Sequence, residues 1–247
     1  MPENGELPVM PMTAIDEITY RTPDALFNGT AVVSVIQSCL PNIKNAWAVP
    51  SIDLDTILAS IRIASYGHSM DVNCVCTKCD NEDTYAVDLR TCIDQIEKPD
   101  YATPIRHGDL EIYFRPLTYK MLNYNNQVQF EEQKMLQALN SMSDQTQEQQ
   151  SEHISNILRK ITDMTVNAIA QSVAVIKTPA SLVSDTKQIA DFLVNCDRRL
   201  FNQIRDRVID LKSDSEIKPL SVTCTNCQNE YKQGFTLDLA SFFDSAS

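Results

Sequence analysis

The chain has 247 residues, a hydrophobic content of 43% and a formal net charge of −12. This length and composition suit a globular protein with one large or two smaller cores. No segment reaches the roughly 18 consecutive apolar residues of a membrane span, and the acidity repels phosphate backbones, so membrane and nucleic-acid partners are both disfavoured.

The amino-terminal part carries several helix boundary signals. Thr22-Pro23-Asp24 and Asn28-Gly29-Thr30 mark helix starts, and Pro41 ends the apolar run that follows. A longer helix is predicted over residues 50–67, where acids in the first turn precede apolar residues at helical spacing. We therefore expect residues 1–69 to form an amino-terminal helical segment.

A duplicated CxxC motif is the most specific pattern in the chain. Residues 76–82 read CTKCDNE and residues 224–230 read CTNCQNE. Two-residue spacing lets both sulfurs of a tight turn bind one ion, and four thiolates complete the tetrahedral shell that structural zinc prefers. We predict a structural Zn²⁺ site, with iron as the alternative occupant, whose ligands are Cys76, Cys79, Cys224 and Cys227.

A shell of four cysteines leaves no position at which water or substrate could be activated. The metal would therefore be structural, and it would close a loop in which 144 residues separate Cys79 from Cys224. A redox role is the alternative interpretation, but redox CxxC motifs are single and need no duplicated flanks. The cysteines are spaced for metal binding, and the start of the sequence carries no export signal. We therefore expect the protein to be located in a reducing cytoplasm.

The flanks of the two motifs also agree with a pair of zinc knuckles. A knuckle needs a residue that tolerates positive φ after its second cysteine, and Asp80-Asn81 and Gln228-Asn229 occupy that place. Each knuckle is expected to open a strand, at residues 84–89 and at residues 234–239. Strand 71–75 precedes the first knuckle.

Four cysteines remain outside the predicted ligand set. Cys74 lies two residues before Cys76 and could compete as a ligand, but its counterpart in the second half is Val222, which favours a buried strand residue. Cys39, Cys92 and Cys196 stand alone and are predicted to be small core residues.

Between the two knuckles the sequence is predominantly helical. Residues 110–115 alternate apolar and polar side chains, which predicts a strand, and Thr118 is a candidate helix cap. Glycine is absent from Thr118 to Lys212. A first helix is expected up to about residue 140, and a second from about residue 150 to the Thr178-Pro179-Ala180 link. Two further helices are expected after Ser184-Asp185 and after Cys196-Asp197. The apolar stripe from Ile154 to Ile169 is predicted to pack within these helices, with a partner-binding seam as the alternative.

These elements together predict an α+β, mostly helical fold. Residues 70–116 and 213–247 would form a small zinc-ribbon β subdomain, and residues 117–212 a helical insertion between its two knuckles. The arginines near residues 198–207 alternate with acids, which is typical of an ion-paired helix face.

No catalytic motif is recognisable. The sequence lacks the glycine-rich phosphate loops of nucleotide enzymes, as well as HExxH and GxSxG patterns. The three histidines, His68, His107 and His153, have no catalytic spacing and are predicted to be structural or exposed. We therefore expect a protein that is not an enzyme.

The amino-terminal sequence resembles that of the baseplate hub assembly proteins of T-even-type myoviruses, which are bacteriophages with contractile tails. The resemblance rests on residues 12–18 (MTAIDEI), 22–26 (TPDAL), 50–53 (PSID) and 61–67 (IRIASYG). It covers about the first 120 residues, including the first knuckle and Arg115-Pro116-Leu117-Thr118, and continues more loosely to the second knuckle. Cys74 and the lack of a glycine after each knuckle depart from the expected pattern.

The resemblance implies a protein-binding role in building the baseplate hub. The chain would act as a non-enzymatic assembly chaperone or scaffold for other hub proteins, located in the host cytoplasm during infection. One alternative is a permanent structural subunit of the hub, located in the virion baseplate, and another is a zinc-ribbon nucleic-acid-binding regulator. A homo-oligomer is a further possible assembly.

Overall fold

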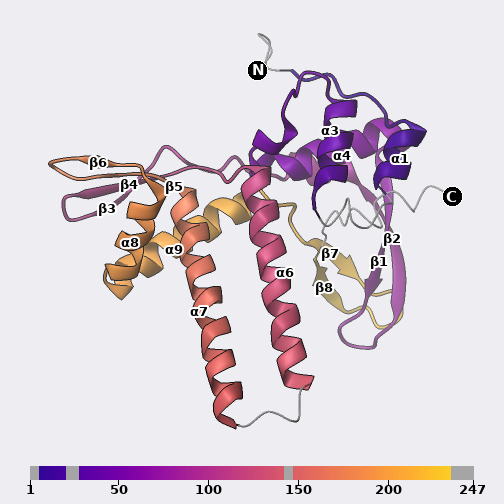
Figure 1. Ribbon diagram of the computed structural model, residues 1–247. Coiled ribbons are helices and arrows are strands. Elements are labelled where there is room, and N and C mark those ends of the chain that lie inside the picture. Colours follow the sequence, from indigo (N-terminus) through magenta and orange to yellow (C-terminus); the bar gives the residue numbers. More distant parts are fainter. Residues whose placement is uncertain (1–5, 21–27, 142–146, 235–247) are drawn as a thin grey trace. The chain divides into compact units, whose positions relative to one another are not determined.

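The computed structural model describes residues 6–20, 28–141 and 147–234, and it divides into two compact units. Unit 1 comprises residues 1–98 and 214–247, and unit 2 comprises residues 99–213 (Figure 1). The chain leaves and re-enters unit 1 at adjacent points, because the Glu97 N–H donates to the Asp214 carbonyl at 3.0 Å. Among the described residues, no helix combines the length and hydrophobicity needed to cross a membrane.

The helices of unit 1 pack around a small apolar core. They are α1 (Ala14–Tyr20), α3 (Thr30–Cys39), α4 (Leu54–Tyr66) and α5 (Leu89–Asp94), with short 3-10 turns at η1 (Ala46–Ala48) and η2 (Ser51–Asp53). Ile36, Ile61 and Leu89 are fully buried within this unit. The predicted helix at 50–67 is confirmed as η2 followed by α4, and Gly67 ends it with a φ of 90°.

Two polar side chains fix the start of α1. The Asp16 carboxylate accepts hydrogen bonds from the backbone N–H and the hydroxyl of Thr13, at 2.8 and 2.7 Å. It also accepts one from the Ser38 hydroxyl on α3, at 3.1 Å. This buried carboxylate therefore caps its own helix and joins it to the next.

The ribbon of unit 1 consists of two separate antiparallel hairpins. β1 (Ser69–Val75) pairs with β2 (Glu82–Asp88), and β7 (Leu220–Thr223) pairs with β8 (Glu230–Gln233). The strand predicted at 84–89 is confirmed through residue 88, and Leu89 begins α5. The strand predicted at 234–239 lies outside the described residues beyond Gly234.

Unit 2 contains one antiparallel sheet and four helices. The strands, in the order β3-β4-β5-β6, are β3 (Ile105–His107), β4 (Leu110–Phe114), β5 (Val173–Lys177) and β6 (Leu182–Val183). The helices are α6 (Tyr119–Ser141), α7 (Gln147–Ser172), α8 (Thr186–Asn195) and α9 (Arg198–Asp214). Figure 1 shows α6 and α7 running antiparallel beside each other as a two-helix arm.

The predicted helix starts in unit 2 are confirmed by their caps. Met121 N–H donates to the Thr118 hydroxyl at 3.3 Å. Asp185 accepts from two backbone N–H groups at the start of α8, at 3.1 and 3.0 Å. Asp197 does the same at the start of α9, at 2.9 and 3.1 Å.

The helix expected from about residue 150 to the Thr178-Pro179-Ala180 link is wrong after Ser172, because β5 and β6 follow α7. The α7 helix ends at Ser172, where Arg115 binds its last carbonyls: Arg115 N donates to Ser172 O at 2.8 Å and Nε to Gln171 O at 3.0 Å. The following Val-Ala-Val-Ile run has high β propensity and pairs with β4. The fold is therefore α+β, with a sheet inside the region expected to be helical.

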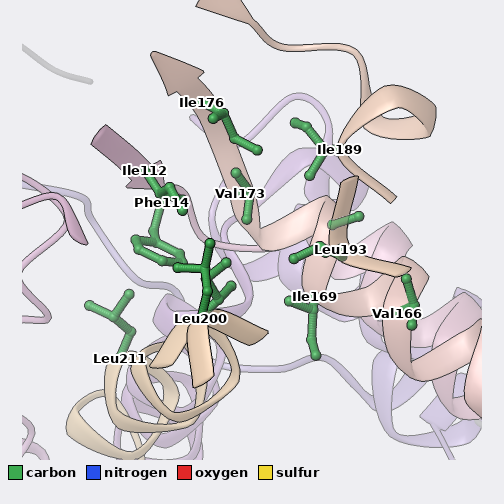
Figure 2. Close-up of a cluster of buried hydrophobic side chains, with 12 residues drawn as sticks. Ile112, Phe114, Val166, Ile169, Val173, Ile176, Ile189, Leu193, Leu200 and Leu211 are labelled. Carbon is green, nitrogen blue, oxygen red and sulfur yellow. The ribbon is translucent and has the colours of Figure 1, made fainter. Parts of the chain in front are cut away.

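A single hydrophobic cluster holds unit 2 together (Figure 2). The sheet, α7, α8 and α9 all contribute, and the members are Ile112, Phe114, Val166, Ile169, Ala170, Val173, Ile176, Ile189, Leu193, Leu200, Ile204 and Leu211. The predicted internal packing of the α7 stripe is confirmed at Ile169, which belongs to this cluster, and Ile157 is also buried. Leu158 is 54% exposed, whereas the side chains of Ile154 and His153 lie outside the described residues.

The other residues singled out in the sequence occupy ordinary structural positions. Cys39 and Cys92 are buried as expected, and burial, with a contribution from Asp16, raises the pKa of the Cys39 thiol to about 11. Cys196 is half-buried. Arg205 and Arg207 of α9 are ion-paired as predicted, since Arg205 contacts Asp206 at 2.7 Å and Arg207 contacts Asp100 at 3.6 Å.

Two isoleucines of α9 provide a test of the unit 2 core. Ile204 is fully buried and Ile209 is 56% exposed. Ile204→Ala is expected to lower the free energy of unfolding by about 2–5 kcal/mol, because it removes buried contacts and leaves a cavity. Ile209→Ala, the matched control, should change it by less than about 0.5 kcal/mol. Urea denaturation measures both, and equal effects would contradict this placement of the core.

Candidate metal centre

The two knuckles, residues 76–81 and 224–229, have the same backbone geometry. In the first, Cys76 N–H donates to Asn81 O at 2.9 Å and Asp80 N–H donates to Cys76 O at 3.0 Å. In the second, Cys224 and Gln228 make the equivalent bonds, both at 3.0 Å. The strand registers match as well, since Cys74 pairs with Asp83 and Val222 with Tyr231. The sequence duplication is therefore a structural duplication.

Each knuckle turns on a residue with positive φ directly after its second cysteine. These residues are Asp80, with a φ of 54°, and Gln228, with a φ of 57°. The predicted place of the left-handed residue is confirmed, but neither asparagine of the two pairs adopts it. Asn81 and Asn229 instead supply the carbonyls that close the turns.

The four predicted ligand sulfurs come together at one point. Cys76 Sγ lies 3.7 Å from Cys227 Sγ, and Cys79 Sγ lies 3.7 Å from Cys224 Sγ. All four sulfurs lie within 4.8 Å of one another. A tetrahedral shell with Zn–S bonds of about 2.3 Å separates its sulfurs by about 3.8 Å, so the donor set fits a zinc ion.

The protonation of the sulfurs points to the same chemistry. The Lys78 N–H, with help from the Cys79 N–H and neighbouring thiols, lowers the pKa of Cys76 to about 6. The Asn229 N–H favours the Cys227 thiolate, but the neighbouring sulfurs and burial outweigh it and raise the pKa of Cys227 to about 12. Sulfurs this close cannot all ionise unless a cation compensates their charge, and a divalent metal would do so.

A buried hydroxyl beside the cluster also fits a charged centre. The Tyr231 hydroxyl is buried and has no hydrogen-bond partner among the described residues. Burial, together with the charges of Cys74, Cys76 and Cys224, raises the pKa of Tyr231. A protonated phenol near sulfurs that become thiolates is a suitable outer hydrogen-bond donor.

Several polar contacts join the two hairpins in addition to the cluster of four sulfurs. Asp83 on β2 accepts hydrogen bonds from Thr225, at 3.2 Å from its backbone N and at 2.8 Å from its hydroxyl. The Tyr85 hydroxyl donates to the Thr223 carbonyl at 2.7 Å, and Asn226 Nδ2 lies 3.8 Å from Cys79 Sγ. Sequence reasoning missed these residues, because no local pattern shows which side chain of one knuckle faces the other.

Cys74 takes no part in the group of four sulfurs found among the described residues. It is 1% exposed, and its Sγ contacts the carbonyl of Val72 at 3.7 Å. Burial raises the pKa of its thiol, with a contribution from the Asp83 charge. Its place outside the group of four sulfurs agrees with the prediction of a buried strand residue.

The arrangement could hold a metal ion, and an ion bound by all four cysteines would leave no place for a substrate on it. Cys76 and Cys224 are fully buried, and Cys79 and Cys227 are half-buried. A fully thiolate-ligated ion would have no open coordination position. Its effect would be to join two hairpins that are each only two-stranded, a size that is marginally stable by itself.

The chain was compared with known protein families, curated proteins and solved structures. A family model described as "T4 bacteriophage base plate protein" matches residues 14–244, a range that includes both knuckles and most of units 1 and 2. No curated protein and no solved structure matches the chain.

Metal content can be tested with two neighbouring cysteines. Chain purified without added metal is expected to contain about one zinc, and Cys76→Ser should lose that zinc together with stability of unit 1, because a three-sulfur site cannot close the shell. Cys74→Val, which copies the Val222 counterpart, is the control and should retain the metal. Elemental analysis of the purified variants measures this. Zinc retained by Cys76→Ser, or lost only from Cys74→Val, would contradict the ligand assignment.

Proposed function

The chain belongs to the family of T4 bacteriophage base plate proteins, and on this premise we propose that it is a non-enzymatic baseplate hub assembly factor. In this proposal the protein binds other hub proteins while the contractile tail is built. The family match over residues 14–244 supports a baseplate protein, and the specific assembly role follows from the resemblance of the amino-terminal sequence to hub assembly proteins. A closed thiolate centre, which would stabilise structure and activate no substrate, is consistent with it.

The two-helix arm of unit 2 is the best candidate for the partner-binding surface. α6 has 23 residues and α7 has 26, and two helices packed side by side leave much of their surface outside the contact. Large apolar side chains are exposed on both, with Tyr124 62% and Leu158 54% accessible. Such side chains favour protein partners, because burying them on association removes apolar surface from water.

The charge distribution favours a basic partner surface for unit 1. Residues 1–98 and 214–247 contain 19 acidic and 8 basic side chains, whereas residues 99–213 contain 14 and 13. Complementary charge raises association rates and suppresses wrong partners. The same acidity disfavours the nucleic-acid-binding regulator considered above.

A permanent structural subunit of the hub is the second candidate function. The family description, a base plate protein, favours it directly, since such a protein would lie in the virion. An assembly factor would act in the host cytoplasm during infection and need not remain in the particle. A second copy of this chain is a further possible partner for the arm.

The arm hypothesis predicts a selective loss of binding. Leu158→Glu on α7 is expected to reduce co-purification of hub proteins from infected cells at least about tenfold, because a charge would be desolvated in the interface. Val194→Glu on α8, at a side chain that is 66% exposed, is the control and should leave binding unchanged. Equal binding by both variants would exclude this face of the arm.

Stoichiometry separates the two candidate functions. Quantitative mass spectrometry of purified mature particles and of infected-cell lysate, normalised to a hub subunit, measures it. An assembly factor should be abundant in the lysate and absent from particles. Stoichiometric presence in particles would contradict the assembly role and support the structural subunit.

A further inference from the structure

The contacts around Asp83 are asymmetric within an otherwise duplicated ribbon. Asp83 and Tyr231 occupy equivalent positions, because they pair with Cys74 and Val222 at the same register of their hairpins. Asp83 reaches across to the other knuckle and accepts both hydrogen bonds from Thr225. Tyr231, in contrast, has a buried hydroxyl without a partner among the described residues. The two hairpins therefore share a backbone but differ in how they contact each other.

Thr225 lies between two predicted ligands in the sequence. It follows Cys224 directly and precedes Cys227 by two residues, so fixing its backbone N–H and hydroxyl also restricts where those sulfurs can lie. The Thr225 hydroxyl and N–H in turn lower the pKa of the Asp83 carboxyl, so the accepting group is ionised at neutral pH. Hydrogen bonds to an ionised acceptor are stronger than neutral ones.

We propose that Asp83 is a positioning residue of the metal centre, which holds the second knuckle against the first before the metal binds. Tyr85 lies two residues after Asp83 on β2, and its hydroxyl donates to Thr223 O at 2.7 Å. This hydrogen bond also holds the second hairpin against the first. The two knuckles are far apart in the sequence, and without such contacts the metal alone would have to bring them together. A site assembled in advance binds more tightly, because apparent affinity scales with the fraction of molecules that are already competent.

This inference goes beyond the proposed role in baseplate assembly and does not depend on it. It concerns residues that are not metal ligands, and its readout is metal affinity in the isolated chain. If the assembly hypothesis failed, the positioning role of Asp83 would be unaffected. Failure of the inference would in turn leave the four sulfurs and the family assignment as they stand.

The decisive variant is Asp83→Ala in the full-length chain. After removal of metal with a chelator, the affinity for Zn²⁺ is measured by competition with a chromophoric chelator. We expect the dissociation constant to rise about tenfold or more, the size of effect that outer-shell partners have on metal sites. Glu82→Ala is the matched control, since it removes an exposed acid from the adjacent position of β2, and it should change the constant by less than about twofold.

Asp83→Asn separates hydrogen bonding from charge. The amide can still accept from the Thr225 N–H and can donate to the Thr225 hydroxyl, but its hydrogen bonds are weaker than those of a carboxylate, so an affinity between those of the parent chain and Asp83→Ala is expected. Weakening equal to that of Asp83→Ala would assign the effect to charge alone and would overturn the proposal. Thr225→Val removes the hydroxyl that donates to Asp83. When combined with Asp83→Ala, it should raise the dissociation constant little further, because both changes remove the same contact.

Hydrogen exchange provides a second readout that a general loss of stability would not reproduce. In metal-free protein, the amides of residues 220–233 should exchange faster in Asp83→Ala than in the parent chain, whereas the zinc-loaded forms should exchange alike. Zinc affinity in Asp83→Ala equal to that of Glu82→Ala would overturn the proposal. If Asp83→Ala cannot be purified in a folded state, the zinc affinity of Thr225→Val is measured instead. An unchanged affinity in that variant would likewise overturn the proposal.

Discussion

The structure of unit 1 depends on the meeting of four sulfurs from two distant parts of the chain. Between Cys79 and Cys224 lie 144 residues, and closing a loop of that length costs conformational entropy. Each knuckle belongs to a hairpin of only two strands, which has little stability by itself. A metal held by all four sulfurs would offset both costs. The Glu97–Asp214 hydrogen bond lies elsewhere in unit 1, where the inserted unit leaves and rejoins it.

The ribbon of unit 1 and the two-helix arm of unit 2 differ in their packing and in the role that we propose for them. Unit 2 has its own core, formed by twelve buried side chains from its sheet and three of its helices, and none of these is a predicted metal ligand. α6 contributes no member to that core, and α7 contributes only residues near its carboxyl-terminal end. Exposed side chains on the rest of the arm, such as Tyr124 and Leu158, are therefore available for contacts with other molecules, which is why we propose the arm rather than the ribbon as the partner-binding surface.

Sequence patterns predicted the local features of this protein better than its long-range contacts. The helix starts at Thr118, Asp185 and Asp197 were predictable, because a cap is a short polar signal followed by a helical apolar pattern. The duplicated CTxC motif indicated the cluster of four sulfurs because ligand spacing is itself a local property. The β5 strand was missed, since its short apolar run follows a long helix directly and resembles a continuation of it. Asp83 was missed for another reason: its importance lies in facing Thr225, and no spacing within the sequence reveals that pairing.

The central claim is that four thiolates close the ribbon around one metal ion, and X-ray absorption spectroscopy at the zinc edge tests it most directly. The full-length chain, purified without added metal, should show a first shell of four sulfurs at about 2.3 Å and no nitrogen or oxygen ligand. A shell that includes nitrogen or oxygen, or a sample without zinc or iron whose ribbon is nevertheless folded, would contradict the account.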